Sequence, residues 1–158
     1  MHTEHLQNVQ PGRVVAGWLV AIAITSFVVC GFILLGLMGE GGARDTGWAI
    51  TAVAVGFLVG GWFTGYATPE APILHGVAVG LTSLAAWVVL NLFMVIAFRG
   101  MEWEGLTASA TTGVILTQIV AAVVGCGVGV RSARERVARL EESPAAVVRD
   151  RGEELDVD

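Results

Sequence analysis

Hydrophobic positions along the chain fall into four long runs, at 14–39, 46–68, 73–98 and 105–130. None of these runs carries an ionisable residue near its centre. A helix of about 20 apolar residues crosses a hydrocarbon core of about 30 Å, and each run is long enough to do so. The pattern therefore predicts an all-α polytopic membrane protein, with a four-helix transmembrane bundle over residues 13–130.

Composition supports this class of protein. Of the 158 residues, 54% are hydrophobic and only 15% are charged, which does not fit a soluble domain. The formal net charge is −5, and nucleic-acid binding needs a basic surface instead. We therefore expect the lipid bilayer as a partner and no nucleic acid.

Polar segments flank the bundle at both ends, and both are too short for a second folded domain. Residues 1–12 are expected to form a tail. Residues 131–142 are expected to continue the last helix, because Glu135 can pair with Arg131 and Arg139 at i,i+4 spacing. A proline disfavours helix at the residue before it, so Ser143 and Pro144 are expected to end this helix. Residues 143–158 would then be a disordered acidic tail.

Arginine is distributed unevenly between the two sides of the predicted bundle. Two arginines lie in the first and third loops, whereas five lie next to the ends of the bundle: Arg13, Arg131, Arg134, Arg136 and Arg139. Arginine-rich flanks stay in the cytoplasm. The sequence therefore predicts a multi-pass protein of the cell membrane with both termini cytoplasmic.

Glycines recur at i,i+4 spacing in the last three runs. The pairs are Gly56 with Gly60, Gly61 with Gly65, Gly76 with Gly80, and Gly125 with Gly129. Small residues at this spacing let two helix backbones approach closely in lipid, so these glycines are predicted helix-packing positions. They could pack within the bundle, or they could serve homodimerisation or the docking of a partner. The two halves of the chain also share a plan, which leaves an internal duplication open.

Uncharged polar residues inside the runs are candidates for interhelical hydrogen bonds, worth about 0.6 kcal/mol each. They are Thr25, Ser26, Asn91, Thr111, Thr112 and Gln118. The run 105–130 has no aromatic residue and is rich in small polar ones, so it is expected to lie centrally and to touch the other three. Gln118 is expected at the depth of Thr25 and Ser26. The alternative is a polar path for a small solute.

The turn between the second and third runs holds Glu70 and His75. An acidic residue near a helix N-terminus fits the helix dipole. One Glu and one His are too few ligands for a typical metal site, so no metal and no cofactor are expected. The two cysteines, Cys30 and Cys126, are expected to be buried, small and apolar, and too far apart for a disulfide.

The same turn carries a resemblance. The pattern Gly60-Gly61-x3-Gly65, a turn with proline, and then His75-Gly76-x3-Gly80 resembles small uncharacterised four-span membrane proteins of bacteria and haloarchaea. The resemblance covers residues 60–80 and the four-helix plan. It implies the same fold and supplies no catalytic residues.

Catalytic motifs are missing from the sequence. There is no H-E-x-x-H, no G-x-S-x-G and no P-loop lysine, so we expect no enzyme. The expected function is that of a non-catalytic accessory or packing subunit, acting as a homo-oligomer or with other membrane proteins. The alternative is a small channel or transporter that uses the face with Asn91, Gln118 and the threonines.

Overall fold

The computed structural model describes residues 10–69, 71–97 and 108–153, which form four packed α-helices. The helices are α1 (Pro11–Leu34), α2 (Ala43–Ala67), α3 (Pro72–Ala97) and α4 (Ala108–Glu153). Each contains a stretch long and apolar enough to cross a membrane. The all-α prediction is confirmed, and the chain has the four spans of an integral membrane protein.

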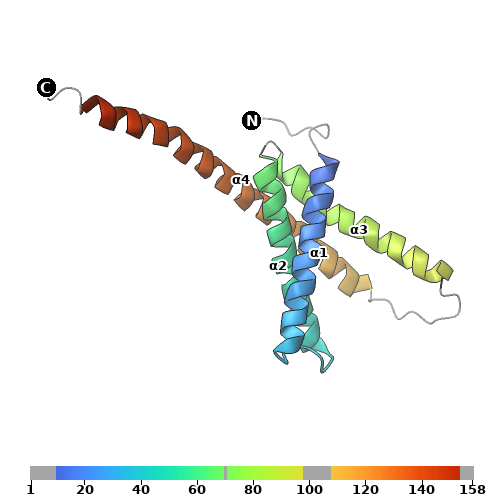
Figure 1. Ribbon diagram of the computed structural model, residues 1–158. Coiled ribbons are helices and arrows are strands. Elements are labelled where there is room, and N and C mark those ends of the chain that lie inside the picture. Colours follow the sequence, from blue (N-terminus) through green and yellow to red (C-terminus); the bar gives the residue numbers. More distant parts are fainter. Residues whose placement is uncertain (1–9, 70, 98–107, 154–158) are drawn as a thin grey trace.

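The helices form two hairpins, α1 with α2 and α3 with α4, which meet where α2 crosses α4 (Figure 1). From this crossing the two hairpins point in different directions. The most extensive contacts join α2 to α4 and α2 to α1, whereas α4 packs mainly against α2 and α3. The central helix is therefore α2, and not the last helix as expected. The reason is that α2 presents glycines toward two neighbours, Gly56 and Gly60 toward α1 and Gly61 and Gly65 toward α4.

The first helix ends at Leu34, before the expected end of the first apolar run. Gly36 has a φ of +69°, a left-handed conformation that favours glycine. The N–H groups of Gly36 and Leu37 donate to the carbonyls of Ile33 and Phe32, at 3.0 and 2.9 Å. These two bonds form a Schellman motif, which ends the helix and satisfies its last carbonyl groups.

The last helix continues through Pro144 to Glu153, so it does not end at Ser143 as expected. A proline within a helix removes one backbone hydrogen bond and destabilises it by about 3 kcal/mol. The residues that follow include Ala145 and Ala146, which favour helix strongly. At 1.5 Å per residue, the 46 residues of α4 span about 69 Å. Its second half therefore extends beyond the other three helices.

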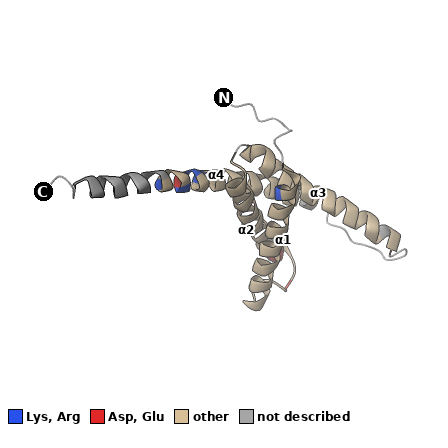
Figure 2. Ribbon diagram, turned by 45° about the horizontal axis from the view of Figure 1, so that its top comes forward, with Lys and Arg blue, Asp and Glu red and all other residues tan. Residues whose placement is uncertain are grey.

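Most large apolar side chains of the four helices are exposed. Phe27 is 79% exposed, Leu34 82% and Val89 66%, while the fully buried positions include Ala21, Ala52 and Ala122. Such a surface matches lipid tails rather than water. Charged residues lie at the start of α1, in the α1–α2 loop and in the second half of α4 (Figure 2). The exposed apolar faces are therefore the surface that contacts the bilayer.

The two cysteines are both free. Cys126 is buried where α4 meets α2, as expected for a small apolar residue. Cys30 is exposed on α1, so the expectation that it is buried is wrong. It lies on a face of α1 that no other helix covers.

Candidate functional site at the helix crossings

Four glycines lie at the crossing of α2 and α4. A Cβ atom added to Gly61 would lie 2.8 Å from the Cα of Ala122, and one added to Gly65 would lie 2.6 Å from the Cα of Cys126. From the other side, a Cβ on Gly125 would lie 2.9 Å from the Trp62 nitrogen. A Cβ on Gly129 would lie 2.7 Å from the backbone nitrogen of Tyr66. Real Cβ atoms essentially never come within 3.0 Å of another heavy atom. A side chain at any of these positions would require the two backbones to separate.

The same crossing has a two-fold pattern. Gly125 and Gly129 follow Gly61 and Gly65 by 64 residues. Their contacts follow the same shift. Gly61 and Gly65 lie against Ala122 and Cys126. Gly125 and Gly129 lie against Leu58 and Trp62, which precede Ala122 and Cys126 by 64 residues. Each contact thus has a counterpart with the roles of the helices exchanged, as in an interface between two identical subunits.

The crossing of α1 and α2 uses the other face of α2. A Cβ on Gly60 would lie 2.7 Å from the Cβ of Ala21, and one on Gly56 would lie 2.6 Å from the Ala21 carbonyl oxygen. Gly17 also belongs here, since its Cβ would lie 3.1 Å from the Gly60 oxygen and would overlap the Thr64 hydroxyl. Gly17 was not predicted from the sequence as a packing position. Its spacing to Ala21 is a small-x3-small pattern, which could have revealed it.

The crossing of α3 and α4 holds the remaining pair. A Cβ on Gly76 would lie 2.6 Å from the Cα of Val123, and one on Gly80 would lie 2.9 Å from the Cα of Ile119. All eight glycines singled out from the sequence therefore face another helix of the same chain.

Thr25 and Gln118 lie at different interfaces. Thr25 lies against Gly56 of α2, and its hydroxyl oxygen is buried with no hydrogen-bond partner among the described residues. Gln118 instead lines a cavity of about 110 Å³ between α3 and α4, together with Ser83 and Trp87. Ser26 is exposed on α1. Depth along the membrane was the basis for grouping these residues, but the rotation of each helix separates them.

The other polar candidates lie toward the far end of the second hairpin. Asn91 donates from its amide nitrogen to the Trp87 carbonyl of its own helix, at 2.8 Å. Thr111 lines the cavity that contains Gln118, and Thr112 is exposed on the same helix. Of the six polar candidates, Gln118 and Thr111 therefore line the same cavity.

His75 joins the start of α1 to the start of α3. Its side chain is buried, the Gln10 N–H donates to Nε2 at 3.2 Å, and Nδ1 lies 2.8 Å from the Ala71 carbonyl oxygen. Because Nε2 accepts a hydrogen bond, the proton is assigned to Nδ1, which then donates to Ala71. His75 thus makes two hydrogen bonds beside the turn. Glu70, the other residue expected there, lies outside the described residues.

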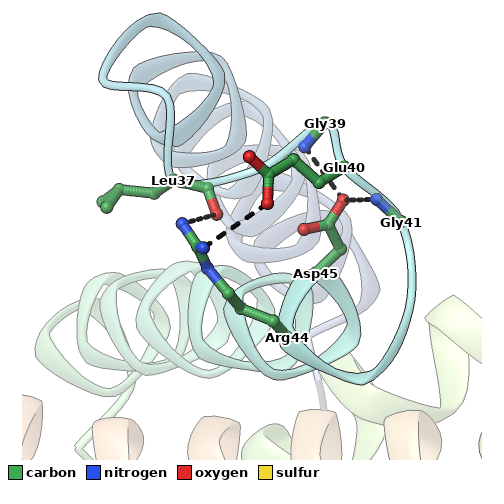
Figure 3. A network of polar contacts seen from close by, with 6 residues as sticks. All are labelled: Leu37, Gly39, Glu40, Gly41, Arg44 and Asp45. Carbon is green, nitrogen blue, oxygen red and sulfur yellow. Dashed lines mark hydrogen bonds and ion pairs between the residues drawn. The ribbon is translucent and has the colours of Figure 1, made fainter.

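The loop between α1 and α2 contains a polar network that was not predicted from the sequence (Figure 3). One carboxylate oxygen of Asp45 accepts from the N–H groups of Gly39 and Gly41, both at 2.9 Å. Arg44 donates to the Leu37 carbonyl at 3.4 Å and lies 3.6 Å from the Glu40 carboxylate. The glycine run beside an acidic helix start was the available signal, because positive φ at these glycines turns their N–H groups toward one acceptor.

Within the ranges that the structure describes, no group of three or more His, Cys, Asp or Glu residues is placed to hold a metal ion. No protein-family model matches the chain, and searches of curated proteins and of solved structures found no match either. No family is identified, and the resemblance over residues 60–80 stays a prediction. What the structure supports is the plan of four long apolar helices.

Proposed function

We propose that the protein is a non-catalytic accessory or packing protein of the cell membrane, which associates with a second copy or with another membrane protein. One observation carries this proposal. An apolar groove of about 450 Å³ stays open between α2 and α4 in the segments that should lie in lipid. Its lining residues are Ala54, Leu58, Leu116, Thr117, Val120, Ala121 and Val124.

The glycines support a packing role inside the chain. Each would place a Cβ within 3.0 Å of an atom of the neighbouring helix, and in lipid such close approach replaces the hydrophobic effect as a source of helix association. Since the predicted pairs already face helices of this chain, association with a partner would use another surface.

The groove between α2 and α4 is that other surface. Its lining combines small residues, Ala54 and Ala121, with larger ones such as Leu58 and Leu116, a composition that suits the ridge of an apolar helix. Leu58, Leu116 and Val120 are exposed. A transmembrane helix of a partner would bury these three side chains more completely than lipid acyl chains do.

The orientation belongs to the same proposal. Basic residues at the start of α1 and in the coloured part of α4 beyond the crossing lie at the end of the bundle opposite the α1–α2 loop (Figure 2). The positive-inside rule then places both termini in the cytoplasm and the loop with Asp45 outside.

Disulfide cross-linking in membranes tests association through the groove. In a background of Cys30→Ser and Cys126→Ala, we expect Val120→Cys to form a disulfide-linked dimer or an adduct with a partner. Ala23→Cys, on an exposed face of α1, is the matched control and should not cross-link. A protein that is monomeric in mild detergent, with no cross-link at position 120 and no co-purifying membrane protein, would refute the proposal.

A second candidate function is a small channel or transporter, favoured by the cavity that holds Gln118, Ser83 and Thr111. Solute flux in proteoliposomes distinguishes it. If pure protein conducts a small polar solute and Gln118→Leu abolishes the flux, transport replaces the accessory role.

A further inference from the structure

A second surface groove, distinct from the one between α2 and α4, lies between the α2–α3 turn and α4. It has a volume of about 270 Å³ and is lined by Pro69, Ala133, Arg134, Val137 and Ala138. Pro69 belongs to the turn between α2 and α3, and the other four residues lie on α4. The walls are therefore apolar except for one guanidinium group.

The aromatic residues nearby mark the depth of this groove. Trp62 and Tyr66 stack on α2 with ring centroids 5.6 Å apart, close to its C-terminal end. Trp62 donates from its ring nitrogen to the Ser132 hydroxyl at 3.5 Å, so the same level of α4 lies beside them. Stacked Trp and Tyr at the end of a span are typical of the headgroup region of a bilayer. The groove lies at this level, directly after Val130, which is buried.

The arginines around the groove differ in their contacts. Arg131 forms an ion pair with Glu135 at 3.2 Å, and Arg136 donates to the Tyr66 hydroxyl at 2.6 Å. Among the described side chains, none forms an ion pair with Arg134, which lines the groove. Its guanidinium is exposed and available to an anion at the edge of an apolar wall.

We propose that this groove binds the headgroup end of an anionic phospholipid. The planar guanidinium of Arg134 donates two parallel hydrogen bonds to the lipid phosphate, a geometry that suits arginine. Pro69 and Val137 contact the glycerol and the first carbons of the acyl chains.

The size of the groove suits part of a lipid. Pockets that enclose a whole small ligand measure about 300–1,000 Å³, and this groove is slightly smaller, at about 270 Å³. A phosphate with its glycerol needs only such a space when the acyl chains stay in the bilayer. A free phosphate ion would leave the apolar wall without a contact, so the groove favours the amphipathic molecule.

Thermal unfolding of the full chain in a non-ionic detergent tests the proposal. Phosphatidylglycerol is added in increasing amounts, and phosphatidylcholine with the same acyl chains and inorganic phosphate are added in parallel. We expect a saturable rise in Tm with phosphatidylglycerol alone. Arg134→Gln should require about tenfold more of this lipid for half the effect, as expected for the loss of a charge-assisted pair of bonds.

Two further variants separate the groove from general surface charge. Ala138→Phe fills the groove without changing the charge and should weaken the effect of the lipid as Arg134→Gln does. Arg139→Gln removes the same charge outside the groove lining and should behave as the unmodified protein does. The proposal fails if phosphatidylglycerol has no effect, if Arg134→Gln and Arg139→Gln behave alike, or if Ala138→Phe binds normally. An equal rise in Tm with inorganic phosphate would also refute lipid binding.

Discussion

Two glycines of α4, only two residues apart, should respond in opposite ways to the same substitution. A Cβ on Gly125 would overlap the Leu58 carbonyl oxygen and lie 2.9 Å from the Trp62 nitrogen, both backbone atoms of α2. A Cβ on Gly127 would have no heavy atom within 4 Å. We predict that Gly125→Ala destabilises the protein and that Gly127→Ala stabilises it.

The magnitude follows from two terms. Replacing glycine by alanine inside a helix stabilises that helix by about 0.5–1 kcal/mol, and this term is common to both variants. At Gly125 the α2 and α4 backbones must also separate, and overpacking of this kind destabilises by about 1–3 kcal/mol. The free energies of unfolding of the two variants should therefore differ by about 1–3 kcal/mol, with Gly127→Ala the more stable.

Equilibrium unfolding in mixed micelles measures this difference directly, because both variants have the same composition. Gly61→Ala is a second test, since Gly61 is related to Gly125 by the shift of 64 residues and faces the backbone of Ala122. It should destabilise by a similar amount. Equal stabilities for Gly125→Ala and Gly127→Ala would show that α2 and α4 are not held at this distance.

Three other predictions concern the polar residues and the orientation. Asp45→Ala removes the acceptor of two backbone hydrogen bonds in the α1–α2 loop and should lower the free energy of unfolding; unchanged stability would show that the loop does not depend on this carboxylate. His75→Phe leaves the Gln10 N–H without its acceptor and should destabilise by about 1–3 kcal/mol in the same assay, an expectation that unaltered unfolding would contradict. In a cysteine-free background, a membrane-impermeant thiol reagent should label Glu40→Cys in intact cells and Arg139→Cys only after permeabilisation; the reverse result would place the termini outside.

The sequence predicted the helices well because hydropathy is a local property. An apolar run of the required length forms a helix in lipid whatever its neighbours are, since its backbone groups must bond internally. The glycine pairs were also visible as a spacing. The spacing does not show which neighbouring helix each glycine faces. The adjacent residues Gly60 and Gly61 face α1 and α4 respectively, and this depends on the rotation of α2 about its own axis.

Other features depended on contacts between distant residues. Gln118 lies beside Ser83 of α3 and not beside Thr25 of α1, because a shared depth does not imply a shared face. The end of α1 was not predicted because Gly36 ends the helix through its backbone conformation. Several glycines follow closely in the sequence, and the sequence does not show which of them ends the helix. Pro144 was taken as the end of a helix, although the strong helix formers on both sides allow α4 to continue.

The length of α4 gives the crossing with α2 a mechanical consequence. The segment beyond Val130 has 23 residues up to Glu153 in one continuous helix, with a length of about 35 Å. A rigid helix acts as a lever, so a tilt of about 10° at the crossing would displace its far end by about 6 Å. A change in the angle between α2 and α4 is thereby converted into a larger displacement of the far end of α4.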